Sequence, residues 1–162
     1  MKQILSQALK IVPLLSSADI TAGVDSDSVD MQGAKSATFL LVFGPSYTEA
    51  GGTGGAVVKL YEGATHAAKT TALTFNYRYG SAAIKSATAD VLSAIATSAA
   101  LTAAAATYTS AILVIEINAD QITDGMRYLT LEIGSQAGAG ELAIVALLDP
   151  MYLSPGGDSV ID

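Results

Sequence analysis

Short apolar segments separated by glycine-containing links run through most of the sequence, and no long amphipathic helical pattern lies between them. This spacing predicts an antiparallel, mainly all-β fold rather than strands and helices alternating around a parallel sheet. About seven or eight candidate strands can be counted, which favours a β-sandwich or jelly roll. A chain of 162 residues can bury one sizeable core, so we expect a single domain.

The strongest strand pattern is the continuous apolar run at residues 38–43, which ends at Gly44 and Pro45. A run without polar alternation predicts a strand buried on both faces. Residues 72–79 instead alternate, with apolar and aromatic side chains on one face and polar ones on the other, and we expect antiparallel pairing with residues 56–62. Further strands are predicted at residues 111–117, 126–133 and 142–148.

The remaining segments carry weaker patterns. Residues 20–31 are acidic and irregular, which predicts an edge strand followed by a turn at Gly33. The Ala-rich residues 87–107 fit helical spacing poorly, and we expect short strands with a loop at 103–106. One helical turn is predicted at residues 119–122.

The ends of the chain are expected to lie outside the core domain. Residues 1–17 predict an N-terminal arm or a short helix, because the apolar positions from Ile4 to Val12 form a one-sided stripe that Pro13 would end. Residues 18–152 form the predicted sandwich, and residues 153–162 a mobile tail. Gln7 and Lys10 interrupt any signal-peptide core, and charges within residues 81–114 argue against a membrane span.

The composition favours permanent contacts with other proteins. Apolar residues make up 51% of the chain and charged residues only 14%, whereas soluble domains carry roughly 25% charge. Interfaces are depleted in Lys, Glu and Asp, so a surface this poor in charge suits them. The formal net charge of −7 and the scattered basic residues argue against direct nucleic-acid binding.

Few residues are candidates for chemistry. The absence of cysteine excludes disulfides, thiolate metal sites and a Cys nucleophile. The single histidine, His66, lies in a predicted link, and a solvated loop residue is favoured over a catalytic one. Residues 51–55 are rich in glycine, but no Gly-Lys-Ser/Thr follows and the next segment is a predicted strand, which argues for a hairpin connection rather than a phosphate loop.

Several acidic residues are candidates for metal binding or for glycoside hydrolysis. Asp25, Asp27 and Asp30 lack the glycine and distal Glu of an EF-hand loop, so a solvated acidic edge is favoured over calcium binding. A carboxylate pair would have to come from the glutamates, and the sequence places no two of them across a cleft. These are Glu49, Glu62, Glu116, Glu132 and Glu141. We therefore predict no catalytic, cofactor-binding or metal-binding residues and no enzyme activity.

Glu116 and Glu132 lie in the middle of predicted strands, which predicts outward positions or hydrogen bonds between subunits. Four tyrosines could form a sugar-stacking face, although aromatic cross-strand pairs in a sheet are the commoner explanation. These are Tyr61, Tyr77, Tyr79 and Tyr128. A carbohydrate-binding module of a virion or a secreted protein is therefore the alternative function.

The strand pattern resembles that of small β-rich proteins encoded near the capsid genes of tailed bacteriophages. The matching segments are residues 23–31, 70–79, 115–120, 127–129 and 146–152. The Ala-rich residues 87–106 depart from the pattern, which leaves the number of strands there open. The resemblance implies a virion protein, a decoration or cement protein of the head, and it carries no catalytic residues.

These observations together predict a structural protein that stabilises the capsid lattice by multivalent contacts. We expect a homo-oligomer, a dimer or a trimer, without cofactor, nucleic-acid or membrane partner. An acidic protein suits the outer capsid surface better than the surface that faces DNA. The expected location is therefore the virion exterior, after synthesis in the host cytoplasm.

Overall fold

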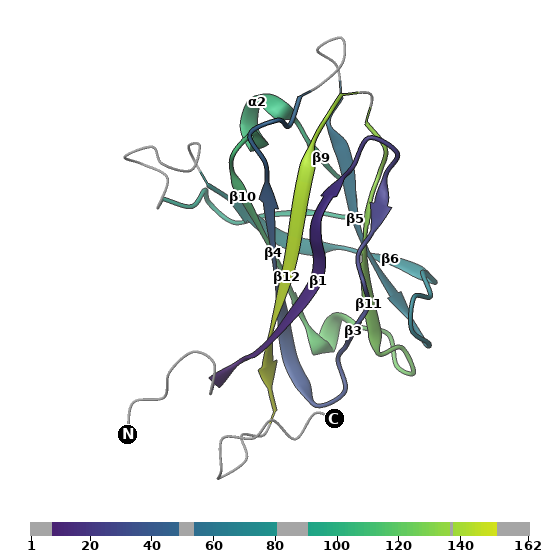
Figure 1. Ribbon diagram of the computed structural model, residues 1–162. Coiled ribbons are helices and arrows are strands. Elements are labelled where there is room, and N and C mark those ends of the chain that lie inside the picture. The colour runs from purple at the N-terminus through teal and green to yellow at the C-terminus, as the bar shows by residue number, and fades with distance from the viewer. Residues whose placement is uncertain (1–7, 49–53, 81–90, 137, 152–162) are drawn as a thin grey trace.

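The computed structural model describes residues 8–48, 54–80, 91–136 and 138–151. Two antiparallel sheets face each other and form a β-sandwich, as the sequence predicts (Figure 1). Sheet A has the strand order β1-β12-β4-β10-β7-β8, and sheet B the order β2-β11-β5-β6. Two more short strands join sheet B, because β3 pairs with β11 and β9 pairs with β5.

The strand bounds follow the predicted apolar segments closely. Sheet A contains β1 (Lys10–Asp19), β4 (Ala34–Phe43), β7 (Phe75–Tyr79), β8 (Ala96–Ser98), β10 (Ile112–Asn118) and β12 (Glu141–Pro150). Sheet B contains β2 (Val24–Asp25), β3 (Val29–Asp30), β5 (Ala56–Gly63), β6 (Thr71–Leu73), β9 (Leu101–Ala103) and β11 (Tyr128–Ile133).

The core lies between the two sheets, where alternate side chains of each strand meet. Side chains on one face of a strand share a period of two residues, so each strand contributes every second residue. Fully buried side chains come from both layers: Phe39, Leu41, Phe43, Phe75, Leu113, Ile115 and Ile117 from sheet A, and Leu60, Leu129 and Leu131 from sheet B. The same period leaves the other half of every strand on an outer face.

The prediction for residues 38–43 was wrong in one respect. This run lies in β4, between β10 and β12, but only its inward side is fully buried. Thr38 and Leu40 are partly exposed, and Val42 is 39% exposed. A continuous apolar run marks two apolar faces, and it does not reveal whether the second is covered within the same chain.

The predicted pairing of residues 56–62 with residues 72–79 is confirmed for its first half only. β5 pairs with β6 in an antiparallel ladder, but β7 crosses to sheet A and pairs with β10. Leu73 and Phe75 are buried on either side of the crossing at Thr74. The apolar and aromatic face of the segment still points to the core, as predicted.

Residues 1–17 were expected to form an arm or a short helix, and most of the described part of this segment is a strand instead. Residues 1–7 lie outside the described part of the chain, and Lys10–Asp19 form β1, an edge strand paired with β12. The open ladder of the apolar strand β12 outweighs a weak helical pattern, since tertiary pairing overrides local propensity. Pro13 is tolerated because β1 is an edge strand. The predicted tail at residues 153–162 is outside the described residues.

The Ala-rich region contains the expected short strands β8 and β9, but residues 103–106 do not form a simple loop. A single helical turn, α2 (Ala105–Tyr108), follows β9. Gly55 allows β9 to approach, because a Cβ atom at this position would lie 1.7 Å from the carbonyl oxygen of Ala103. The predicted turn after β10 is confirmed as a 3-10 helix, η2 (Ala119–Gln121).

Candidate functional site: the two outer faces of the sandwich

The outer face of sheet A is apolar over its middle. Residues that pair directly across antiparallel strands point to the same side of a sheet, and one such row crosses four strands without a polar side chain. It consists of Pro13, Val145, Leu40 and Val114 in turn. Val42 and Ile112 extend this surface on one side of the row, and Ile11 and Leu147 on the other. We call these eight residues the apolar face.

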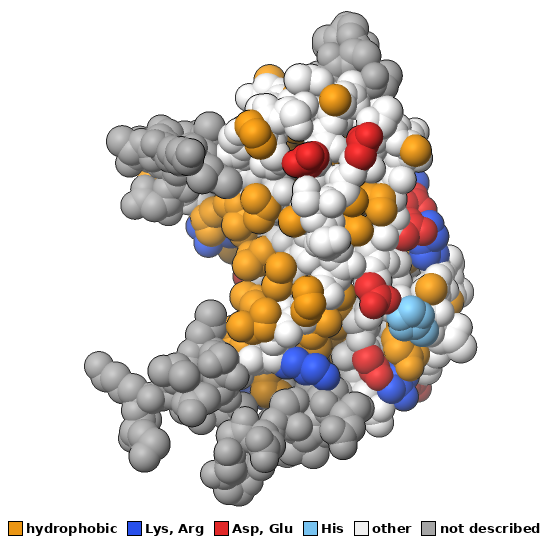
Figure 2. Space-filling model, viewed as in Figure 1, with side chains coloured by type: hydrophobic (Ala, Val, Ile, Leu, Met, Phe, Trp, Pro, Cys, Tyr) orange, Lys and Arg blue, Asp and Glu red, His pale blue; other side chains and the backbone are white. Residues whose placement is uncertain are grey.

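The large exposed apolar side chains concentrate on this side of the molecule. In the described residues, these side chains all belong to sheet A strands or to segments beside them. They are Ile11, Val42, Val91, Ile95 and Met151, between 39% and 63% exposed. Figure 2 shows hydrophobic side chains gathered over β1, β12 and β4, with most of the visible charged side chains to their right. Of the eight residues of the apolar face, Ile11 and Val42 belong to this exposed group, whereas Val114 is only 9% exposed. Exposed apolar patches are a common feature of interaction sites.

A polar hollow adjoins the apolar face. It has a volume of about 200 Å³ and is lined by Ser36, Ala37, Thr38, Asn76, Glu116, Ile117 and Asn118. Glu116 pairs across the sheet with Thr38 on one side and Asn76 on the other. The side chains of these three residues form no hydrogen bond or ion pair with the other described residues. The hollow therefore holds hydrogen-bonding groups that are free to meet a ligand or a partner.

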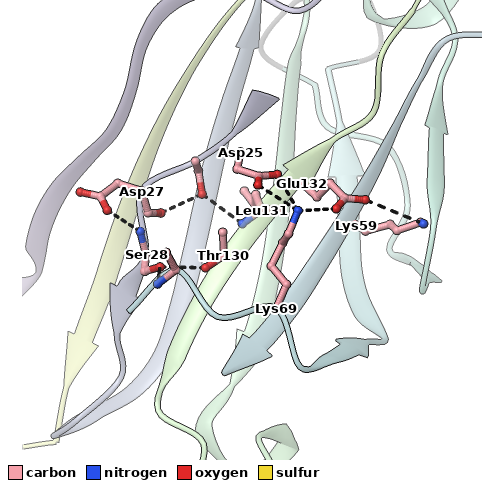
Figure 3. A network of polar contacts seen from close by, with 10 residues as sticks. Asp25, Asp27, Ser28, Lys59, Lys69, Thr130, Leu131 and Glu132 are labelled. Atoms are coloured by element: carbon pink, nitrogen blue, oxygen red, sulfur yellow. Dashed lines mark hydrogen bonds and ion pairs between the residues drawn. The ribbon is translucent and has the colours of Figure 1, made fainter. Parts of the chain in front are cut away.

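The outer face of sheet B is different, because its charged side chains bind one another (Figure 3). The Lys69 ammonium donates to Asp25 Oδ2 over 2.9 Å and to Glu132 Oε2 over 2.6 Å. Lys59 Nζ lies 3.9 Å from the other oxygen of Glu132. The hydrogen bonds to Asp25 and Glu132 raise the pKa of Lys69 to about 12. We call these four residues the ionic network.

The link between β5 and β6 is held to the acidic segment beside it. His66 Nε2 lies 2.7 Å from Asp27 Oδ1, and both side chains are more than half exposed. The amide of Ala67 donates to Ser28 Oγ, which in turn lies 2.8 Å from Thr130 Oγ1. The single histidine is thus an exposed loop residue paired with a carboxylate.

The three aspartates considered for calcium each meet a different basic side chain. Asp25 pairs with Lys69, Asp27 with His66, and Asp30 with Arg127. The hydrogen bond from Arg127 lowers the pKa of Asp30 below its ordinary value. The arrangement is that of charge-compensated surface side chains, and no group of three or more metal-ligating side chains is found among the described residues.

The candidate glutamates do not form a catalytic pair in the described structure. Glu116 lies on the outer face of sheet A and Glu132 on that of sheet B, as their mid-strand positions predict. Glu141 begins β12 and Glu49 lies outside the described residues. No pocket described here is lined by two of them.

Glu62 is buried, although the sequence analysis considered it only as one of five candidate carboxylates. Its side chain is fully buried and accepts hydrogen bonds from the Thr123 amide over 2.7 Å and from the Thr123 hydroxyl over 2.6 Å. It therefore ties the turn after η2 to β5. The signal was present, since Glu62 shares strand parity with the buried Val58 and Leu60.

The four tyrosines do not form one sugar-stacking face, which was the less favoured explanation for them. Tyr77 and Tyr79 pack against the core from inside sheet A. Tyr61 lies beneath the Lys69 ammonium, 5.8 Å from ring centre to nitrogen, and Tyr128 lies beside Arg127 and His66. The crossing of the chain between β6 and β7 places these rings in different layers.

The described residues 8–48, 54–80, 91–136 and 138–151 contain no helix that is long and apolar enough to span a membrane.

Of the glycine-rich link at residues 51–55, only Gly54 and Gly55 are described. They lie on the connection from sheet A to sheet B, so this link does not close a hairpin. A second open pocket of about 370 Å³ lies at the turn after η2, between Met31, Ile122 and Arg127.

The fold and its two outer faces define the chain as a two-sheet antiparallel β-sandwich protein. No protein-family model matches the chain, and no curated protein sequence matches it. Among solved structures, the crystal structure of the SPBc2 prophage-derived protein YomS is similar, with a TM-score of 0.48 and 10% sequence identity. The alignment covers 86% of this chain and 92% of that chain. A likeness of this degree carries no argument about function.

Proposed function

We propose that the chain is a non-enzymatic structural protein of a tailed-phage particle, a decoration or cement protein on the outer surface of the head. The observation that carries this proposal is the apolar face of sheet A. A folded domain that leaves such a surface uncovered is suited to lasting contact with other protein chains, because water is displaced from it on association. The phage assignment itself comes from the resemblance of the strand pattern.

The physical role would be mechanical. A protein that binds only the assembled shell stabilises that shell by its binding free energy, and repetition over the lattice multiplies each modest contact. The low charge and the small side chains of the chain suit close packing against neighbours. The partners are the major capsid lattice and further copies of the chain, with no direct contact to nucleic acid or membrane.

The test uses heads assembled without this chain from the phage genome that carries its gene. Purified protein is added, the heads are sedimented, and the bound protein is counted per head. We expect saturation at a fixed ratio and a higher temperature of genome release. Heads that bind no protein, or that bind it without gaining stability, would overturn the proposal.

A second function, carbohydrate binding, is favoured by the polar hollow. Its free carboxylate, amide and hydroxyl groups match the donors and acceptors of a sugar. The tyrosines do not contribute, so recognition would depend on hydrogen bonds alone. Binding on a glycan array that is lost in Asn76→Ala would support this function, and the absence of any bound glycan would reject it.

A further inference from the structure

Two opposite charges lie beside the apolar face without an ionic partner in the described chain. Arg78 continues the apolar row on β7, directly opposite Val114. Glu116 lies two residues further along β10 and faces the same side. Arg78 Nε donates to the Ser93 carbonyl over 2.9 Å, and Glu116 forms no ion pair with a described residue. Each charge is available to a partner that brings the opposite sign.

A second copy of the chain supplies a partner of opposite charge for both residues, because it carries its own Arg78 and Glu116. Neighbouring strands lie about 4.8 Å apart and residues two apart on a strand about 6.8 Å apart, which fixes the approximate positions of the outward side chains. On this grid, a two-fold axis lying between two facing sheets and passing between Leu40 and Val114 exchanges the positions of Arg78 and Glu116. Each Arg78 then meets the partner's carboxylate, and the reverse, as two-fold symmetry requires.

The same axis places apolar side chains at the centre of the contact. Leu40 and Val114 lie next to it. The partly exposed Leu40 packs on its counterpart in the other copy, whereas Val114 is only 9% exposed and adds little surface to the contact. The axis runs obliquely to the strands, which makes the strands of the two copies cross at a steep angle, as in orthogonal sheet packing. Apolar residues at the centre with charges at the rim is the usual anatomy of a protein interface.

Pairing through strand edges is less suitable. The edge strand β1 contains Pro13 and two irregularities in its register, and the opposite edge strand, β8, has three residues. Proline and bulges on an edge, and short edge strands, prevent continuous pairing with another sheet. The faces rather than the edges are therefore the surfaces for contact.

We propose that two copies of this chain pack through the outer faces of sheet A as a two-fold dimer, with Arg78 of each copy paired with Glu116 of the other. This inference rests on the proposed function and names the partner of its apolar face. Contact with the capsid lattice then belongs to the remaining surfaces. The dimer is the unit that binds the head.

The test measures mass by sedimentation equilibrium from about 1 μM to about 1 mM, a range that covers weak and moderate affinities. We expect the full chain to form dimers, and R78E and E116R each to weaken dimerisation at least about tenfold, which corresponds to about 1.4 kcal/mol. Mixing the two variants should restore dimers of one copy of each, because the reversed charges then match across the axis. Rescue in trans cannot arise from contacts within one chain.

Matched controls are available on the other side of the sandwich. K59E and D124R make the same charge changes at exposed positions away from sheet A, and both should leave the dimer intact. A full chain that is monomeric throughout, a trimer, or a dimer that R78E and E116R do not weaken would overturn this inference. A monomer that still saturates and stabilises heads would overturn it while leaving the proposed function standing.

Discussion

The outer face of sheet B carries charged side chains that pair with one another, whereas the middle of the outer face of sheet A is apolar. On sheet B, Lys69 links the carboxylates of Asp25 and Glu132, so the charges are balanced within the chain. On sheet A, the row from Pro13 to Val114 is apolar, and the charges beside it, Arg78 and Glu116, remain unpaired. An antiparallel sheet with one solvated face normally alternates apolar and polar residues. Sheet B follows that rule and the middle of sheet A departs from it, which is the basis of the proposed contact between sheet A and protein.

The difference between the two outer faces is tested most directly by placing a charge on the apolar face. Leu40→Asp should reduce self-association at least about 100-fold, because burying an unpaired carboxylate at the centre of a contact costs several kcal/mol. The midpoint of thermal unfolding should change less than the self-association, since Leu40 faces outward and is partly exposed in the monomer. Sedimentation and calorimetry together check both expectations.

The control for this change is Val57→Asp, an equivalent substitution on the outer face of β5 in sheet B. It should leave self-association at the level of the unmodified chain. Equal losses in Leu40→Asp and Val57→Asp would show that the two faces do not differ in the way proposed.

The second prediction concerns the buried polar group of sheet B. Glu62→Leu should lower the free energy of unfolding by about 2–3 kcal/mol, because the Thr123 amide and hydroxyl lose their acceptor. Urea unfolding measures the loss, with Asp124→Leu as a control that removes an exposed carboxylate with no partner among the described residues. A Glu62→Leu protein as stable as the unmodified chain would mean that Glu62 does not hold the turn after η2.

The pH dependence of stability should follow the ion pairs on the sheet B side. The pKa of Asp30 is lowered from 3.8 by Arg127, so this carboxylate stabilises the fold above about pH 4 and loses that effect as the pH falls through its folded-state value. The pKa of Lys69 is raised from 10.5 to about 12, so its contribution is complete below about pH 10 and is lost as the pH rises through about 12.

Asp30→Asn isolates the acid side of this behaviour. The variant should be less stable than the unmodified chain by about 0.5–1 kcal/mol at pH 7, a size set by the partial exposure of the pair. The difference should shrink as urea unfolding is repeated at lower pH, towards about pH 3. A difference that stays constant from neutral to acid pH would assign the loss to packing instead.

The smallest effect is expected at the edge of the ionic network. Lys59 lies 3.9 Å from Glu132 and its side chain is 36% exposed, so Lys59→Met should change the free energy of unfolding by less than about 0.5 kcal/mol. The comparison variant Lys69→Met removes two close ion pairs and should cost more. If the two substitutions cost the same, the network does not depend on Lys69.

Much of the architecture follows from local pattern. The apolar runs at β4, β10 and β12, the alternation at β7 and the turn at η2 are all in the sequence, and the structure confirms them. The strand at Lys10–Asp19 is not visible in this way, because its pairing depends on the open ladder of β12 far along the chain. The separation of the four tyrosines into different layers is not visible for a similar reason, since no local signal reports that the chain changes sheets at Thr74.

The antiparallel sandwich can be predicted from local sequence pattern, because the period of two and the glycine-rich links act over a few residues. The outward positions of Glu116 and Glu132 follow from the same pattern. Which outer face carries paired charges and which is apolar depends on the fold, because that is set by strands brought together from distant parts of the chain. The candidate interaction face is therefore a property of strand order, and strand order is not encoded in any single segment.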